Sequence, residues 1–174
     1  LLVFHRIASS DDIGLISLDG DRASEILLGS PFLEMEPSLS LDGRFLAYLS
    51  DESGEREVYV RPFPQGDGRW QASTGGGDEP SWSPSGREIF YRRGDAMMAV
   101  DVETEPEFRP GRSTPLFEGR FEVDPFSHDA RNYDVAPDSS GFLMVQPVSA
   151  ETLAPLQLEV VLNWFEELKQ MVPN

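Results

Sequence analysis

The residues that could do chemistry are few. The chain has two histidines, His5 and His128, and no cysteine. Ser127, His128 and Asp129 are the residue types of a hydrolytic triad, but a triad requires side chains that converge in space, and no Gly-x-Ser-x-Gly turn is present to expose a nucleophile. We therefore interpret these three residues as part of a polar loop and predict no catalytic residue.

Metal and phosphate chemistry is also poorly supported. Without cysteine, two distant histidines do not predict a zinc site, and no Asp-x-Asp-x-Asp-Gly calcium loop occurs. The run Gly75–Gly77 lacks the lysine and the helix of a phosphate-binding loop, so we interpret it as a linker. We predict no cofactor and no metal, and we expect three acidic groups to be solvated turn residues: Asp51–Glu52, Asp78–Glu79 and Asp101 with Glu103.

Composition excludes several partners. The 174 residues include 14 basic and 31 acidic side chains, a net charge of −17, whereas nucleic acids and anionic membranes attract basic surfaces. We interpret the charge as a solvated acidic surface, with attraction to a basic partner or a cation as the alternative. Apolar runs such as 45–49 are far shorter than the roughly 20 residues that span a bilayer, so we predict no membrane insertion.

Three segments of the chain resemble one another. Each has an apolar residue in a short strand, a tight turn and a second strand rich in aromatic or aliphatic residues. The second segment starts 43 residues after the first, and the third starts 53 residues after the second, a spacing typical of four-stranded propeller blades. The segments are Pro37–Tyr48, Pro80–Tyr91 and Tyr133–Val145, with Gly43, Gly86 and Gly141 aligned and the third turn one residue longer.

Further strands are predicted around these repeats. Alternating residues indicate third strands at 57–61 and 97–102, and outer strands are expected at 70–73 and 114–117. Ranges 2–7, 14–18 and 24–28 match the second, third and fourth strands of an earlier blade, and 156–162 matches a third strand of a later one.

The sequence therefore predicts an all-β fold, a single partial β-propeller domain over 1–174. It has about three to four antiparallel, four-stranded blades, near 1–30, 37–74, 80–118 and 133–162. A short C-terminal helix is predicted at 164–172, where Asn163 and Glu166 suit a helix start. This helix would cover an end of the propeller or, alternatively, contact a partner.

The segment 103–131 is the least repetitive. It contains Phe108, Phe117, Phe121 and Phe126. We interpret it as a long loop held by aromatic side chains over the outer strand, with a binding loop as the alternative.

The wider pattern resembles a known family. Asp42–Tyr48, Ser50–Gly54, Glu57–Pro64, Ser73–Gly77 and Val160–Trp164 occur in order. Together they resemble the C-terminal propeller of bacterial serine/threonine protein kinases and of some winged-helix regulators, and the repeated segments that begin at Pro37 and Pro80 resemble the TolB-like or WD40-like propeller repeat. Leu41 and Ala136 depart from the repeat's usual Pro and Ser. The resemblance implies an interaction or sensor module of a signalling protein, with catalysis belonging to a separate kinase domain.

Two functions follow as hypotheses, and a purely structural fragment that binds no ligand is a third alternative. The first is a non-catalytic protein-interaction or ligand-sensing propeller, with a protein partner and a homo-oligomer that completes the ring, because three to four blades leave apolar faces open. The second is an enzyme, for instance a carbohydrate-active one, with a site at the propeller channel, where a calcium ion is a further alternative. Ligand-binding residues and the cellular compartment stay open.

Overall fold

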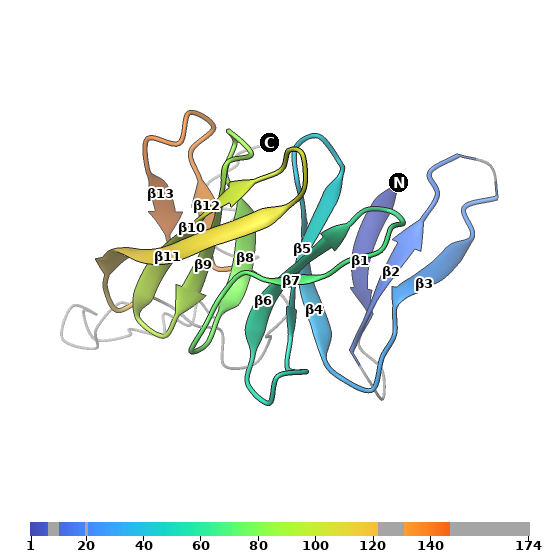
Figure 1. Cartoon of the computed structure of the whole chain (residues 1–174), viewed down its shortest axis with the longest axis horizontal. Helices are drawn as coiled ribbons and strands as arrows, with labels where there is room; N and C mark the ends of the chain where they lie inside the picture. The colour runs from blue at the N-terminus through green and yellow to red at the C-terminus, as the bar shows by residue number, and fades with distance from the viewer. Residues whose placement is uncertain (7–10, 20, 122–130, 147–174) are drawn as a thin grey trace, which may run out of the picture.

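The computed structural model describes residues 1–6, 11–19, 21–121 and 131–146, and this part of the chain contains strands and turns but no helix (Figure 1). Its strands form four antiparallel sheets in which sequence neighbours pair. Blade 1 is β1 (Leu2–Arg6), β2 (Asp12–Ile16) and β3 (Ser24–Leu28). Blade 2 is β4 (Glu34–Leu39), β5 (Phe45–Ser50), β6 (Glu57–Pro62) and β7 (Trp70–Gln71). Blade 3 is β8 (Asp78–Trp82), β9 (Glu88–Arg93), β10 (Ala96–Glu103) and β11 (Arg109–Glu118), and blade 4 holds β12 (Tyr133–Val135) and β13 (Phe142–Met144).

The four sheets lie side by side in chain order (Figure 1). The predicted all-β fold of antiparallel blades is confirmed. Blades 2 and 3 have the predicted four strands, and within the described residues blade 1 has three strands and blade 4 has two. The predicted strand 156–162 and helix 164–172 lie outside the described residues.

Alternating side chains of the central strands belong to different interfaces. In β5, Phe45 and Ala47 join the core between blades 2 and 3, whereas Leu46 and Tyr48 join the core between blades 1 and 2. In blade 3, Phe90 of β9 turns away from blade 2 and packs toward blade 4. Because period-two alternation places neighbours on opposite sheet faces, each central blade is covered on both sides. Face-to-face stacking of this kind is the architecture of a propeller.

The hairpins between first and second strands share one geometry. The backbone amides of Ser40, Ser83 and Ala136 each donate to the carbonyl of the residue five positions later, at 2.9 Å in every case. Gly43 and Gly86 adopt φ of +69° at the turn. The third turn is therefore not longer, and its equivalent position is not Gly141 but Ser139, at φ +59°. Here the hairpin bonds impose a left-handed conformation on a residue other than glycine.

Replacing Ser139 with glycine is expected to raise the free energy of unfolding by about 0.5–1 kcal/mol, because the left-handed conformation is strained for a residue with a Cβ. Gly43→Ala is the matched control and should lower the free energy of unfolding by about 1 kcal/mol. Nothing lies within 4 Å of a Cβ built on Gly43, so its cost arises from the backbone alone. Urea unfolding of both variants measures the difference, and a destabilised Ser139→Gly would contradict the assigned turn.

The segment 103–131 is not a loop throughout, which corrects the sequence interpretation. Residues 109–118 form β11, which extends well beyond the predicted outer strand 114–117 and pairs with β10. Phe108 is only 2% exposed and packs between blades 2 and 3, and Phe117 packs against Phe142 of blade 4. Phe108 and Phe117 thus belong to the cores between blades, while residues 122–130, which include Phe126, lie outside the described part.

Candidate functional site: a groove across the first strands

The first strands of blades 2 and 3 carry the same bulge. Pairing of β4 with β5 shifts register between Met35 and Ser38, and pairing of β8 with β9 shifts between Asp78 and Ser81. Within each bulge a glutamate with positive φ, 53° at Glu36 and 54° at Glu79, precedes a proline. Because proline has no N–H to donate to the ladder, a bulge is a place where a strand can accept it.

These bulges bring a carboxylate of each blade to the backbone of the next. The Glu36 carboxylate accepts a hydrogen bond of 2.6 Å from the Glu79 backbone N–H. The Glu79 carboxylate in turn accepts from Asn132 in blade 4, at 3.3 Å from the backbone N–H and 3.2 Å from Nδ2. The same position on three successive first strands therefore forms a chain of hydrogen bonds between blades.

The sequence prediction for these acidic residues was partly wrong. Asp78 and Glu79 lie in β8 rather than in a turn, and Glu79 is buried. Asp101 and Glu103 likewise lie in β10, whereas Asp51 and Glu52 do follow the end of β5. The sequence does carry a signal for the repeated glutamate, because Glu36 and Glu79 each directly precede the Pro-Ser pair that begins their repeat.

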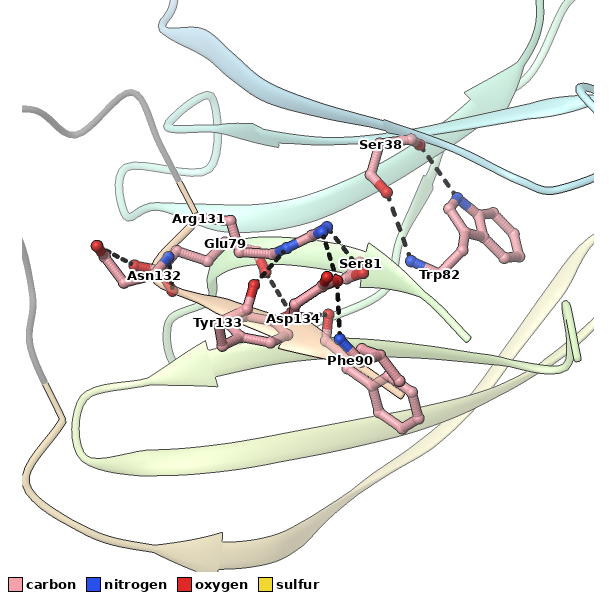
Figure 2. Close-up of polar contacts among 10 residues, drawn as sticks. Ser38, Glu79, Ser81, Trp82, Phe90, Arg131, Asn132, Tyr133 and Asp134 are labelled. Carbon is pink, nitrogen blue, oxygen red and sulfur yellow. Dashed lines mark hydrogen bonds and ion pairs between the residues drawn. The ribbon is translucent and has the colours of Figure 1, made fainter. Parts of the chain in front are cut away.

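Additional hydrogen bonds join the first strands (Figure 2). Trp82 donates from its backbone N–H to Ser38 Oγ at 3.4 Å and from Nε1 to the Ser38 carbonyl at 3.2 Å. The buried Tyr133 hydroxyl donates to the Glu79 carbonyl at 2.7 Å. Burial raises the pKa of Tyr133, which favours the protonated hydroxyl that donates this hydrogen bond.

Arg131 crosses from blade 4 to blade 3, as Figure 2 shows. Its Nη1 donates to Ser81 Oγ at 2.8 Å, its Nε donates to the Tyr133 carbonyl at 2.9 Å, and its Nη2 lies 3.4 Å from Asp134 Oδ1. The guanidinium also stands 5.3 Å from the centre of the Tyr133 ring. These contacts fix a cationic side chain in one position.

A groove of about 550 Å³ runs across the three first strands beside Arg131. We call it the first-strand groove. Polar groups line it together with exposed apolar and proline side chains. Its lining includes Ser38, Leu39, Leu41, Ser81, Trp82, Arg131, Asp134 and Pro137.

Glu36 has unusual electrostatics within the hydrogen-bond chain. Burial, opposed by the hydrogen bond from Glu79 and reinforced by the negative charges of Asp78 and Glu79, raises the pKa of Glu36 from 4.5 to about 7. Between these two values the folded chain holds a proton that the unfolded chain has released. Stability therefore falls as pH rises through this interval.

The variant Glu36→Gln tests this proton. The free energy of unfolding of the variant, relative to wild type, should rise by about 2 kcal/mol between pH 4.5 and pH 7.5, because only the wild type loses the stability that the Glu36 proton contributes. Glutamine keeps an oxygen that can accept from Glu79. Urea unfolding at the two pH values measures the change, with Glu107→Gln on the exposed surface as control. Equal pH dependence of wild type and Glu36→Gln would contradict the assignment.

The candidate chemical residues do not converge. His5 lies on β1 with Nε2 at 3.4 Å from Asp11, in blade 1, whereas the first-strand groove lies on blades 2 to 4. Residues 127–129 lie outside the described part. Among the described residues there is no group of three His, Asp or Glu that could hold a metal ion. Nor does that part contain a helix with the length and apolar character to cross a membrane.

Comparison with known proteins identifies the type of fold. No family model matches the sequence, and no curated protein matches it. Among solved structures, TolB from Acinetobacter baumannii superposes with a TM-score of 0.59 and 17% sequence identity, over 85% of this chain and 35% of that chain. The chain thus spans about a third of that protein's length. The stacked antiparallel blades and this likeness together show a TolB-like β-propeller fold.

Proposed function

We propose that this chain is a non-catalytic interaction module that binds a protein or peptide segment in the first-strand groove. The observation that carries the proposal is the groove itself, which crosses three blades and offers a fixed cation, Arg131, beside exposed apolar groups such as Leu41. Ligand sites commonly combine an apolar lining with a few positioned polar groups.

The polar groups of the groove keep hydrogen-bonding capacity for a ligand. Ser38 Oγ accepts from Trp82, and Ser81 Oγ accepts from Arg131, so each hydroxyl can still donate its own proton. The hydrogen bonds of Arg131 in the described structure use three of the five N–H groups that a guanidinium carries. An extended peptide, with carbonyl oxygens along its length, supplies acceptors for these donors.

An enzymatic role has less support from this groove. Glycoside hydrolysis uses two carboxyl groups on opposite sides of the substrate. Among the described residues that line the groove, Asp134 is the one carboxylate. This composition favours binding over hydrolysis.

We also propose that this interaction module is part of a larger signalling protein. The blocks Asp42–Tyr48 and Glu57–Pro64 resemble propellers that accompany bacterial kinase domains, and the fold agrees with a propeller of the TolB kind. We therefore assign the chain to a bacterial signalling protein as its ligand-sensing or partner-binding part.

A random-peptide display library, panned on the immobilised chain, tests the binding role. Selected peptides should bind wild type and lose at least tenfold in affinity on Arg131→Ala, because that change removes the cation of the groove. Arg109→Ala, on the exposed face of β11, is the matched control and should bind like wild type. Peptides that bind Arg131→Ala as tightly as wild type would place the binding surface elsewhere.

A further inference from the structure

The two end blades each present a face that no other described blade covers. On blade 1 this face carries Leu2, Phe4 and Ile26. Residues that pair across neighbouring strands share a sheet face, and Phe4 and Ile26 both pair with Gly14. Leu2 lies two residues before Phe4 and therefore points to the same face. We call it the leading face. On blade 4 the corresponding face carries Leu143, since Phe142 and Met144 on either side of it pack toward blade 3. We call it the trailing face.

The leading face can be compared with its equivalents position by position. The hydrogen bond from the Glu34 amide to the Asp11 carbonyl recurs one blade later as the bond from the Gly77 amide to the Arg56 carbonyl. This correspondence places Leu2 at the position of Leu46 in blade 2. Leu2 is 49% exposed, whereas Leu46 is fully buried against blade 1.

The trailing face differs from its equivalents in the same way. The shared hairpin bonds place Leu143 at the position of Ala47 in blade 2 and of Phe90 in blade 3. Ala47 and Phe90 are 0% and 4% exposed, because the next blade covers each of them. Leu143 is 74% exposed. Both end faces therefore carry apolar side chains at positions that are buried in the interior blades.

The leading and trailing faces correspond to the two surfaces that pack together between blades 2 and 3. Between blades 2 and 3, the face with Ala47 packs on the face with Ile89 and Tyr91. Leu143 stands at the position of Ala47, and Leu2 stands at the position of Ile89. The trailing face of one molecule therefore has the geometry that receives the leading face of another.

We propose that the leading face of each chain binds the trailing face of a second copy, so that two chains close one ring. The described residues of two copies bring together eight sheets, and closed propellers typically have four to eight blades. Closure would cover both exposed apolar faces of both chains. The charge of −17 on each chain opposes this association, so added salt is expected to strengthen it. The inference goes beyond the proposed function and does not depend on binding in the first-strand groove.

Light scattering of the full chain at micromolar concentration tests the ring. The buffer should contain about 0.3 M salt, so that repulsion between the two acidic chains is screened. Wild type should show twice the mass of the 19.4 kDa chain. Leu2→Glu and Leu143→Lys should each halve the measured mass. Each substitution puts a charged side chain into the apolar contact at each of the two junctions of the ring. The double variant Leu2→Glu/Leu143→Lys should recover the doubled mass, since the new charges have opposite sign.

Leu41→Glu is the matched control, because Leu41 is 82% exposed and lies in the first-strand groove rather than on an end face. It should keep the doubled mass while weakening peptide binding, which separates the ring from the binding function. Circular dichroism checks that each variant keeps its strands. A single-chain mass for wild type overturns the proposal, and so does a doubled mass for Leu143→Lys, which would mean that leading faces pair with each other.

Discussion

Replacing Phe108 with alanine is expected to lower the free energy of unfolding by about 4 kcal/mol, the upper range for loss of a buried aromatic side chain. Phe108 is 2% exposed and precedes β11, the outer strand of blade 3. Its ring centre lies 5.1 Å from that of Phe45 and 4.9 Å from that of Trp70, both in blade 2. The substitution therefore leaves a cavity between two blades, where collapse would require both sheets to move.

Urea unfolding followed by tryptophan fluorescence measures this loss, because Trp70 and Trp82 both contact the Phe108 ring. Phe32→Ala is the matched control, since Phe32 is 42% exposed, and it should change the free energy of unfolding by less than about 1 kcal/mol. Similar losses for the two variants would contradict the central place of Phe108 between blades 2 and 3.

Replacing Glu57 with alanine is expected to cost about 3 kcal/mol, because a buried acceptor of several hydrogen bonds is removed. Its Oε1 accepts from the backbone amides of Gly75 at 2.8 Å and Gly76 at 3.0 Å, and its Oε2 accepts from the Ser73 hydroxyl. These three residues lie in the linker from β7 of blade 2 to β8 of blade 3. Without the carboxylate, the linker loses its anchor and its amides lose their partner.

Two further variants sharpen the Glu57 result. Glu57→Gln keeps one acceptor oxygen and should lose roughly half as much stability as the alanine variant, because its amide nitrogen cannot accept from the second set of donors. Glu55→Ala, two residues earlier and exposed, should stay within about 0.5 kcal/mol of wild type. A Glu57→Ala variant as stable as Glu55→Ala would show that the linker does not need this anchor.

Local features of the sequence predicted the strands well. The expected strand at 24–28 is β3, and the expected strand at 57–61 is β6, which ends one residue later. Alternation and turn glycines are properties of neighbouring residues, so one segment of sequence is enough to recognise them. The residues of the first-strand groove could not be predicted in the same way, because Arg131 and Ser81 meet only when blades 3 and 4 stack.

The errors have the same physical origin. From its neighbours in sequence, Glu79 is expected to be a solvated acidic residue. It is buried because the blades on either side stack against it, and it forms hydrogen bonds with Glu36 in one and Asn132 in the other. Ser139 adopts the conformation expected of glycine because the hairpin bonds around Ala136 impose it. In both cases tertiary contacts outweigh the preference of the single residue.

The alternation of side chains in β5 restricts how the length of this chain can vary. Deleting one residue inside β5 would send the side chains after the deletion to the opposite face, so Ala47 and Tyr48 would exchange interfaces. Both cores would then be mispacked at once. Insertions and deletions should accordingly be confined to hairpin tips and linkers, or should comprise whole blades, which preserve the order of faces along the array.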